Sequence, residues 1–295
     1  MRKIGLVFLI TLLLVLAVTS GCVTSEQAKK PNTEKTAAPA SAISAVSPAM
    51  TPFDEDTRTM KTIGIIGGVS WASSIDYYRI MNEKVQQDLG GDHSAKILMY
   101  SIEFGDFSKQ ERLAAQGNWD PLNATMISAA KRLKAGGADF IVIASNTLNS
   151  RADDIENQVG LPVLRIYDAT GAKVNRSGLK KVALLGTKYT MEAPFYRDAL
   201  ENKYGIQVVT PNLAERDYIN TVIFDELCRN EIRNESRAEY VRIINRLVDE
   251  EGAQGVILGC TEIPLLVHQG DVKVPVFDTT RIHAEAAVDY ALNRT

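Results

Sequence analysis

Short apolar runs recur along the chain from position 62 onward, and each run ends in small polar residues. The two clearest runs, 140–144 and 256–259, contain no polar side chain, which is typical of strands buried on both faces of a parallel sheet. Segments between the runs, such as 74–89 and 121–135, carry apolar residues at helical spacing. This alternation of strand and helix predicts an α/β fold built on parallel sheets.

The hydrophobic pattern predicts a full set of elements. Strands are expected at 62–66, 95–102, 161–166, 181–186, 207–210 and 274–277, with two more that end at Ser145 and Cys260. Helices are expected at 74–89, 121–135, 150–158, 217–228 and 236–251, with a last one from Thr280. The polar, irregular segment 104–119 is expected to form a mobile lid or a short helix.

The second half of the chain repeats the pattern of the first half. The stretches 137–147 and 252–262 both begin with Gly-Ala, pass through an apolar run and leave it through small or acidic polar residues. Laid over each other, they place Ser145 opposite Cys260. Two further matched pairs recur at a similar separation of about 115 residues: 61–67 with 181–186, and 161–163 with 274–276.

A repeat of this length indicates a duplicated domain rather than a solenoid unit. We therefore expect two pseudosymmetric α/β lobes, each a mainly parallel sheet flanked by helices, with the active site between the lobes. The expected boundaries assign 60–172 and 273–295 to lobe 1, and 173–272 to lobe 2. Ser145 and Cys260 would then face each other across the cleft, because open α/β sheets bind ligands at the carboxyl ends of their strands.

The N-terminus has a different character. A positive start at 1–3 is followed by an apolar run at 4–18 and by small residues before Cys22. Residues 1–22 therefore resemble a lipoprotein-type signal in which Cys22 receives the lipid. The apolar run is shorter than the roughly 20 residues that a spanning helix needs. An uncleaved N-terminal anchor is the alternative.

Residues 23–59 are rich in Ala, Ser, Thr, Pro and Lys, with almost no large apolar side chains. Such a segment cannot bury enough apolar surface to offset its ordering entropy, so we expect a disordered tether. The protein is then an exported lipoprotein, anchored to the membrane by its N-terminal lipid and facing the cell exterior or periplasm. Translation from Met60, the natural start of a free-standing enzyme, is the alternative.

Composition narrows the class of partner. Apolar residues make up 45% and charged residues 23% of the 295 positions, as in a globular protein with a sizeable core. The formal net charge of −3 gives no electrostatic footprint for nucleic acid. His93, His268 and His283 are too dispersed along the chain for a metal triad, so we expect no metal.

The three cysteines do not indicate a disulfide framework. Cys22 is accounted for by the lipid, and Cys228 lies in a helical pattern where a small buried hydrophobe is expected. Cys260 remains as a thiol at a strand end. Such a thiol can act as a nucleophile or general base when helix dipoles or a cation lower its pKa.

A glycine pair, Gly67-Gly68, follows the first expected strand and leads through Val69 and Ser70 into a helix. The pattern is not the dinucleotide motif G-x-G-x-x-G, and no acidic residue lies at the required distance, so we exclude a nicotinamide site. A ligand carboxylate at the N-terminus of the following helix suits this loop better. A tight turn without a ligand is the alternative.

Small polar residues gather at the other strand ends as well. They are Ser145, Asn146, Thr147, Thr187, Cys260, Thr261 and Glu262. This set contains hydroxyl and amide groups and one thiol, but few cations. It therefore suits a small polar anion that is held by hydroxyl and backbone N–H groups.

From Met60 to its end, the chain resembles the aspartate/glutamate racemase family. The resemblance rests on 65–71 with Tyr77-Tyr78, on 145–147, on 185–191, on 259–262 and on 277–284. It implies two pseudosymmetric α/β lobes and catalysis without a cofactor, with neither pyridoxal phosphate nor a metal. It also implies two acid/base residues, normally both cysteines, on opposite faces of the substrate α-carbon. Because dimerisation is usual in the family, a homodimer is an expected form.

The chain departs from the family at the first acid/base position, where Ser145 replaces a cysteine. A hydroxyl is a far poorer acid or base than a thiol, whose reference pKa is about 8.5. A branch of the family with a hydroxyl residue there is reported to favour L-substrates. Asn149 also stands where many relatives have a histidine. We therefore expect a lopsided mechanism, in which Cys260 is the competent acid or base and Ser145 donates or relays a proton.

The resemblance implies an acidic amino acid, aspartate and/or glutamate, as the small-molecule substrate. Its amino and carboxylate groups are expected to contact Asn146, Thr147, Thr261 and Glu262. Its remaining carboxylate is expected to contact Thr187, Val69 and Ser70.

Two alternatives remain open. One is a single-cysteine member of the superfamily, decarboxylase-like or a hydantoin racemase. The other is an exported lipoprotein that binds acidic amino acids without catalysis. The intact Cys260-Thr261-Glu262 sequence favours the racemase, because a pure binding protein has no need of the thiol.

Overall fold

The computed structural model describes residues 59–294. The predicted signal with its lipidated Cys22, and the predicted tether as far as position 58, lie outside these residues. In the part that is described, no helix is both long and apolar enough to cross a bilayer.

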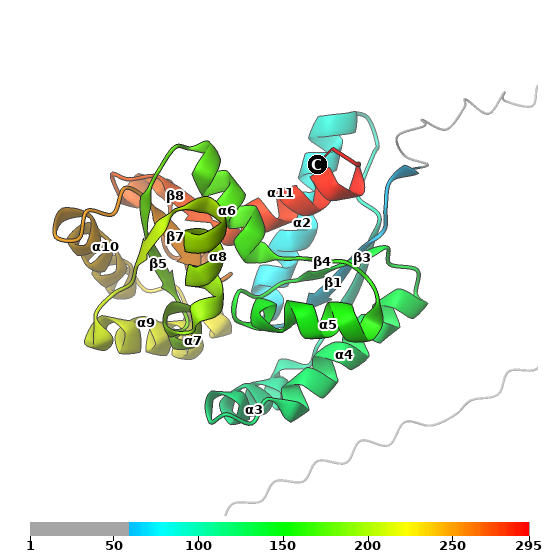
Figure 1. Cartoon of the computed structure of the whole chain (residues 1–295), viewed down its shortest axis with the longest axis horizontal. Helices are drawn as coiled ribbons and strands as arrows, with labels where there is room; N and C mark the ends of the chain where they lie inside the picture. The colour runs from blue at the N-terminus through cyan, green and yellow to red at the C-terminus, as the bar shows by residue number, and fades with distance from the viewer. Residues whose placement is uncertain (1–58, 295) are drawn as a thin grey trace, which may run out of the picture. The chain divides into compact units, whose positions relative to one another are not determined.

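The first lobe is built on a four-stranded parallel sheet in the order β2-β1-β3-β4 (Figure 1). Its strands are β1 (Ile63–Gly67), β2 (Ile97–Ser101), β3 (Phe140–Ile143) and β4 (Val163–Leu164). Alternate residues of β3 point to opposite faces, so Phe140 and Val142 enter one apolar cluster and Ile141 and Ile143 enter another. Burial on both faces explains the uninterrupted apolar run of this strand.

The second lobe repeats this arrangement in a sheet with the order β6-β5-β7-β8. Its strands are β5 (Lys181–Gly186), β6 (Gln207–Val209), β7 (Val256–Gly259) and β8 (Val276–Asp278). The two sheets therefore share one strand order, in which β3 and β7 occupy equivalent positions beside β1 and β5. This confirms the predicted fold class of two similar, parallel α/β lobes.

Helices cover both faces of the first sheet (Figure 1). They are α2 (Trp71–Leu89), α3 (Phe104–Ala115), α4 (Asp120–Ala135), η1 (Thr147–Arg151), α5 (Ala152–Val159) and α6 (Ile166–Arg176). Helix α2 packs on one face, and α4 and α5 pack on the other. Helix α6 follows β4 but packs against the sheet of the second lobe and one of its helices.

The second lobe is flanked in the same way. Its helices are α7 (Lys188–Glu192), α8 (Pro194–Tyr204), α9 (Leu213–Asp225), η2 (Leu227–Arg229), α10 (Asn234–Asp249), η3 (Ile263–Leu265) and η4 (Gln269–Asp271), and the described chain closes with α11 (Thr279–Ala291). Helices α9 and α10 cover one face of the sheet, and α6 and α8 cover the other.

The segment that was expected to be a lid or a short helix forms the continuous helix α3. Glu103 caps its N-terminus, because the carboxylate accepts hydrogen bonds from the N–H groups of Gly105 (2.7 Å) and Asp106 (2.8 Å). Phe107 and Ala114 are buried beneath the helix. Local capping and these apolar contacts explain why the polar sequence is helical.

The predicted division of the chain between the lobes differs from the structure at 273–295. Strand β8 pairs with β7 and so belongs to the second sheet, whereas α11 returns to pack on α2 of the first lobe. Ala284, Ala287 and Val288 of α11 are buried against that lobe. The last strand therefore belongs to the second lobe and the last helix packs on the first.

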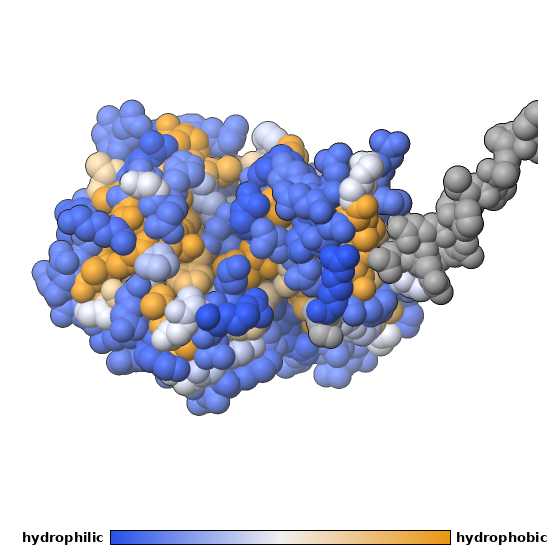
Figure 2. Space-filling model, turned by 90° about the horizontal axis from the view of Figure 1, so that it is seen from above, coloured by the Kyte–Doolittle hydropathy of each residue, from blue (hydrophilic) through white to orange (hydrophobic). Residues whose placement is uncertain are grey.

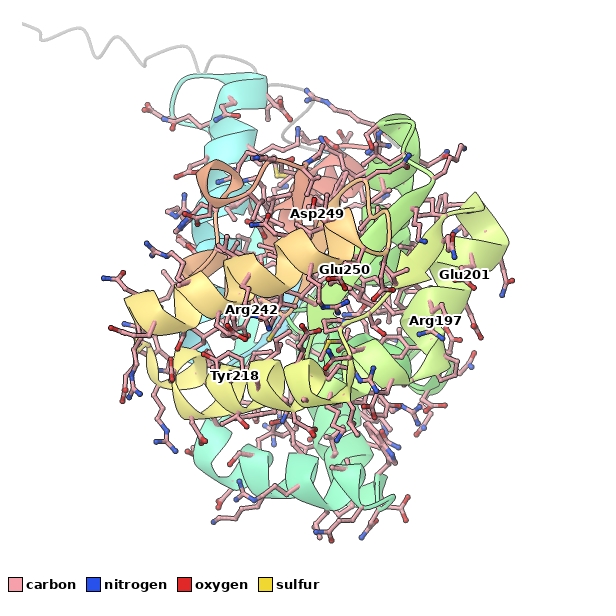
Figure 3. The ribbon with its side chains drawn as sticks, turned by 90° about the vertical axis from the view of Figure 1, so that its left-hand side faces the viewer. Arg197, Glu201, Tyr218, Arg242, Asp249 and Glu250 are labelled. Atoms are coloured by element: carbon pink, nitrogen blue, oxygen red, sulfur yellow. The ribbon has the colours of Figure 1, made fainter. Side chains whose placement is uncertain are left out.

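The outer side of the second lobe carries a charged network (Figure 3). Glu215 of α9 accepts hydrogen bonds from Arg246 (2.6 and 2.9 Å) and from Arg242 (3.2 Å), both on α10. Burial alone would raise the pKa of Glu215, but the arginine hydrogen bonds lower it below its usual value. The network therefore joins α9 to α10 outside the apolar cluster beneath them.

Hydrophilic side chains dominate the face shown in Figure 2, between smaller hydrophobic groups.

Candidate active site

Ser145 and Cys260 follow the equivalent strands β3 and β7 and line the same cavity. Both side chains are nearly enclosed, with exposed fractions of 9% for Ser145 and 7% for Cys260. The cavity has a volume of about 30 Å³, close to the space that one water molecule takes in the liquid. An amino acid therefore fits only if the cavity walls move apart.

The structure brings every predicted catalytic and substrate-binding residue to this cavity. The predicted residues that line it are Val69, Ser70, Ser145, Asn146, Thr147, Thr187, Cys260, Thr261 and Glu262. They come from loops after β1, β3, β5 and β7, because the carboxyl ends of parallel strands meet at one edge of each sheet. Their assigned roles stay predictions, but their common location is a structural fact.

The thiol of Cys260 is paired with a carboxylate. Its Sγ donates a hydrogen bond to Oε2 of Glu262 at 3.0 Å, and the hydroxyl of Thr261 donates to the same oxygen at 2.9 Å. Burial and then the negative charge of Glu262 raise the pKa of the Cys260 thiol well above its usual value. The resting thiol is therefore protonated, with a proton acceptor in direct contact.

Glu262 also connects the two lobes. Its Oε1 accepts hydrogen bonds from the backbone N–H (3.2 Å) and the hydroxyl (3.1 Å) of Ser70, which follows β1 in the first lobe. The nearby N–H of Gly68 donates to the hydroxyl of Ser74 at 2.8 Å. These N–H groups of the glycine loop are thus already bonded within the protein. A ligand carboxylate, as the sequence suggested there, would have to compete with Glu262.

Ser145 has a different environment from that of Cys260. Its hydroxyl accepts a hydrogen bond from the N–H of Leu148 at 3.4 Å, and no carboxylate bonds to it in the described part of the chain. Asn149 holds the backbone of this loop, because its Nδ2 donates to the carbonyl oxygens of Ser145 (2.7 Å) and Ile143 (3.1 Å). Its Oδ1 accepts from the N–H of Ile166 at 2.9 Å. Asn149 therefore positions the loop through its backbone.

Hydroxyl groups from both lobes meet on another wall of the cavity. The hydroxyl of Thr147, after β3, lies 2.8 Å from that of Thr187, after β5, and 3.1 Å from that of Thr190. The Thr187 hydroxyl also caps α7 by accepting from the N–H of Thr190. These hydroxyls can turn toward a ligand oxygen, because each donates and accepts hydrogen bonds.

Asn146 presents a spare acceptor. Its Nδ2 donates to the Thr279 hydroxyl at 2.9 Å, and that hydroxyl donates in turn to the carbonyl oxygen of Leu258 at 2.7 Å. The buried Oδ1 of Asn146 has no hydrogen-bond partner among residues 59–294. Because leaving a buried polar atom unpaired costs free energy, this oxygen is ready to accept from a ligand ammonium group.

Sequence reasoning missed several residues that line the cavity. Cys228 was expected in a helix as a small buried hydrophobe, but α9 ends at Asp225 and the half-buried Cys228 lies in η2 at the cavity wall. Burial, with the charges of Glu262 and Glu111, raises the pKa of its thiol. Glu111 and Phe104 reach the cavity from α3. Nothing in the local sequence marks these positions, since tertiary packing alone brings them to the strand ends.

Glu111 is a second carboxyl group in the cavity. Its Oε2 is buried and has no hydrogen-bond partner in the described structure. Burial, and after it the charge of Glu262, raise the pKa of Glu111 to about 7, although Arg112 acts in the opposite direction. Glu111 is therefore partly protonated near neutral pH.

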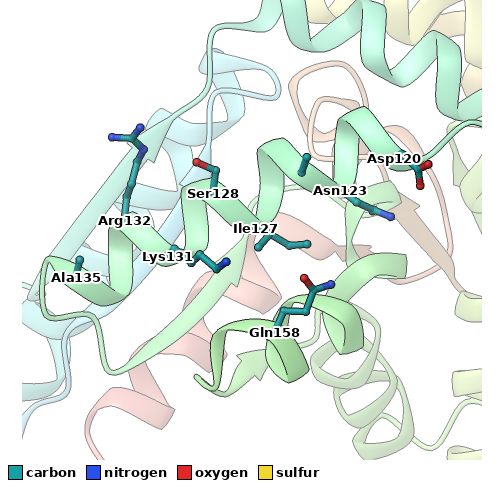
Figure 4. Close-up of a pocket in the computed structure, with 9 residues that line it drawn as sticks. Asp120, Asn123, Ile127, Ser128, Lys131, Arg132, Ala135 and Gln158 are labelled. Carbon is teal, nitrogen blue, oxygen red and sulfur yellow. The ribbon is translucent and has the colours of Figure 1, made fainter.

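A larger hollow lies elsewhere, along α4 and the end of α5 (Figure 4). It has a volume of about 760 Å³ and is lined by residues that include Asn123, Ile127, Lys131 and Gln158. None of the predicted site residues line it. Size alone therefore does not identify the functional site, which is set by the chemistry at the strand ends.

His283 is buried away from the cavity. Its Nε2 donates to the carbonyl oxygen of Leu164 at 2.8 Å, and its Nδ1 accepts from the hydroxyl of Tyr77 at 2.9 Å. Burial lowers the pKa of His283 to about 4, so it is a neutral structural residue. In residues 59–294, no group of His, Cys, Asp and Glu side chains is arranged to hold a metal ion.

Comparison with known proteins adds independent information. The model of the Asp/Glu/Hydantoin racemase family matches residues 66–287. The crystal structure of a "putative Asp/Glu Racemase" from Yersinia pestis shares 50% identity and covers 79% of this chain and 100% of that protein, with a TM-score of 0.71.

Two further relatives are more distant. An aspartate racemase homologue from Pyrococcus horikoshii shares 38% identity, covers 79% of this chain and 99% of its own, and has a TM-score of 0.66. The broad specificity amino-acid racemase of Bacillus subtilis is 22% identical over 172 residues, which are 57% of this chain and 72% of that protein.

Proposed function

Because the chain belongs to the Asp/Glu/Hydantoin racemase family, we propose that it interconverts the enantiomers of aspartate and/or glutamate without a cofactor. At the coarser level, the protein is an isomerase of the amino-acid racemase type. The proposal assigns Cys260 and Ser145 to opposite faces of the substrate α-carbon. It is supported above all by one observation: these side chains follow equivalent strands of the two lobes and line one cavity.

Proton removal starts at the pair of Cys260 and Glu262. The thiol proton passes to the Glu262 carboxylate across the 3.0 Å hydrogen bond, which leaves a thiolate. The thiolate then takes the α-proton of the substrate, and the electron pair of the broken C–H bond remains on the substrate as a carbanion. General acid–base catalysis of this kind contributes about 10²- to 10⁴-fold in rate.

Proton return comes from Ser145 on the other face. Its hydroxyl gives a proton to the carbanion and becomes an alkoxide, while Cys260 holds the α-proton that it removed. The proton on Glu262 then reaches the Ser145 oxygen through solvent, which restores all three groups. Because an alkoxide is costly at neutral pH, this step limits turnover and makes the two directions unequal.

The remaining groups orient the substrate. The unpartnered Oδ1 of Asn146 accepts from the substrate ammonium group. The hydroxyl of Thr147 donates to the α-carboxylate, and that of Thr187 donates to the remaining carboxylate. Thr261 shares the Glu262 oxygen with Cys260 and so keeps that carboxylate in place. Val69 and Ser70 form the part of the wall that the first lobe contributes beside Glu262.

Exchange of the α-proton with D₂O tests this proposal directly. Each enantiomer of aspartate and glutamate is incubated with the full-length chain and followed by NMR. We expect exchange in the wild type and its loss in Cys260→Ala. Absence of exchange with all four compounds, or undiminished exchange in the variant, would defeat the proposal.

The same samples separate the rival functions. Stereoselective binding of an acidic amino acid without exchange would indicate an exported binding lipoprotein. Release of CO₂ from malonate-type compounds would indicate a decarboxylase-like enzyme, and epimerisation of hydantoins a hydantoin racemase.

The proposed location is testable separately. We propose that the chain is exported and attached to the membrane through a lipid on Cys22, for the sequence reasons given above. Replacing Cys22 by Ala should move the protein from the membrane fraction to the soluble fraction without changing α-proton exchange. Unaltered membrane attachment in this variant would contradict the lipid anchor.

A further inference from the structure

We propose that Glu111 is a specificity-determining residue that donates a hydrogen bond, in its protonated form, to the side-chain carboxylate of an acidic substrate. This inference rests on the proposed function, because it names the group of this same site that would recognise the acidic side chain.

The position of Glu111 places it in the wall that both lobes form together. It reaches the cavity from α3 of the first lobe, where Phe104 of the same helix also lines the space. Ile223 and Phe224 approach from α9 of the second lobe. Glu111 is half-buried as a residue, but its Oε2 is enclosed in a cavity that these apolar side chains also line.

The hydrogen bonding of the two cavity carboxyls is unequal. Both oxygens of Glu262 accept hydrogen bonds, from Ser70 on one side and from Cys260 and Thr261 on the other. The buried Oε2 of Glu111 has no such partner in the described residues. Glu262 thus uses its acceptor capacity within the protein, whereas Glu111 keeps hydrogen-bonding capacity for a ligand.

The charges around Glu111 favour its neutral form. Burial raises its pKa most, the charge of Glu262 raises it further, and Arg112 on the same helix lowers it, with a result of about 7. The Cys228 thiol of η2 also faces this group and is protonated. Two like charges in one desolvated cavity are unfavourable, so the carboxyl that lacks donors holds its proton to a higher pH than an exposed glutamate does.

An acidic substrate brings a second carboxylate that needs a donor. No lysine or arginine lines the cavity within residues 59–294. A protonated Glu111 supplies a neutral donor for this carboxylate, and an ionised Glu111 repels it. A site built around such a donor discriminates against substrates without a matching acceptor, because its polar group is then left unpaired.

The experiment measures binding and exchange together. The dissociation constant of L-aspartate is measured by calorimetry on the full-length chain at about pH 6 and about pH 8, with α-proton exchange on the same samples. Because only the protonated form binds well, the wild type should lose about tenfold in affinity between the two conditions. L-Asparagine, whose side chain is neutral, should show little change.

Three variants complete the test. In Glu111→Gln the amide always donates, so aspartate affinity should stay within about twofold between the two pH values. In Glu111→Met the donor is lost, so affinity should fall about tenfold or more at the lower pH. Asp106→Asn is the matched control, because Asp106 is an exposed carboxylate of the same helix, and it should behave as the wild type.

The outcomes separate this proposal from the proposed function. Suppose that the wild type exchanges the α-proton but its aspartate affinity rises with pH, or that Glu111→Gln shows the same pH dependence as the wild type. Either result would overturn the role of Glu111 and leave the proposed racemase activity intact. The predicted binding pattern without any exchange would support Glu111 and overturn the racemase. Neither binding nor exchange would overturn both.

Discussion

The ends of strands β3 and β7 hold equivalent places in two sheets of the same order, yet their chemistry differs. After β7, the Cys260 thiol donates to the Glu262 carboxylate, and Thr261 supports the same oxygen. After β3, the only hydrogen bond of the Ser145 hydroxyl in the described structure comes from the backbone N–H of Leu148, and Asn149 holds the backbone of the loop. One strand end therefore holds a thiol in contact with a proton acceptor. The other holds a weakly acidic hydroxyl in a loop whose backbone is hydrogen-bonded to Asn149.

This difference shows that duplication preserved geometry more strictly than chemistry. The strand order, the register and the burial of Ser145 and Cys260 are shared between the lobes. The carboxylate partner is not shared. Glu262 follows β7 and reaches across to Ser70 of the first lobe, whereas no carboxylate bonds to Ser145 in the described residues. The proposed lopsided mechanism therefore has two causes: Ser145 has a hydroxyl where Cys260 has a thiol, and only Cys260 is hydrogen-bonded to a carboxylate in the described residues.

Removing the thiol should have the largest effect. Cys260→Ala is expected to lower α-proton exchange by about 10³-fold or more, because it removes the group that moves the proton. The measurement is initial exchange in D₂O, with Ser177→Ala, an exposed position, as the control. A loss below about tenfold would mean that the thiol end is not the competent one.

Neutralising the carboxylate partner should come next. Glu262→Gln is expected to lower turnover by about 10²-fold, since the thiol loses its proton acceptor. The charge of Glu262 raises the pKa of Cys260, so removing it should lower that pKa and let the thiolate form at a lower pH. Alkylation rate against pH reports this shift. An unchanged alkylation profile would show that Glu262 does not control the thiol.

Loosening the serine loop should have an intermediate effect on stability. Asn149→Ala removes two donated hydrogen bonds and one accepted bond, all buried, and should lower the free energy of unfolding by roughly 2–4 kcal/mol. Denaturant titration measures the change. The half-buried Asn82 of α2 donates to the carbonyl oxygen of Tyr78 and accepts from the N–H of Ala95, so Asn82→Ala is a control with a smaller expected loss. Equal losses at both positions would contradict a special role for Asn149.

Restoring a thiol at the first strand end should have the smallest effect on rate. Ser145→Cys is expected to raise turnover by up to about tenfold and to make the two directions more equal, because a thiol is the better acid. Ser177→Cys makes the same substitution at an exposed position and should leave turnover unchanged. Slower turnover in Ser145→Cys would show that the hydroxyl itself is needed.

Much of the site could be predicted because its groups lie on strand ends. Apolar runs followed by polar residues located the positions of Ser145 and Cys260, and the repeat paired them. The residues on helices were missed: Glu111 and Cys228 lie in segments whose sequence indicates only a polar helix and an apolar helix face. Their approach to the cavity depends on how α3 and η2 pack, and no local pattern encodes that packing.

By itself, the sequence determined the alternation of strands and helices, the duplication and the edge where the polar residues gather, because these follow from short-range hydrophobic periodicity. Tertiary structure alone decided that Glu262 bridges Cys260 and Ser70 and that α11 returns to the first lobe. It also decided that the Oε2 of Glu111 has no hydrogen-bond partner among residues 59–294. Hydrogen bonds and electrostatic shifts between segments far apart in the chain arise only when packing removes water and sets their distances.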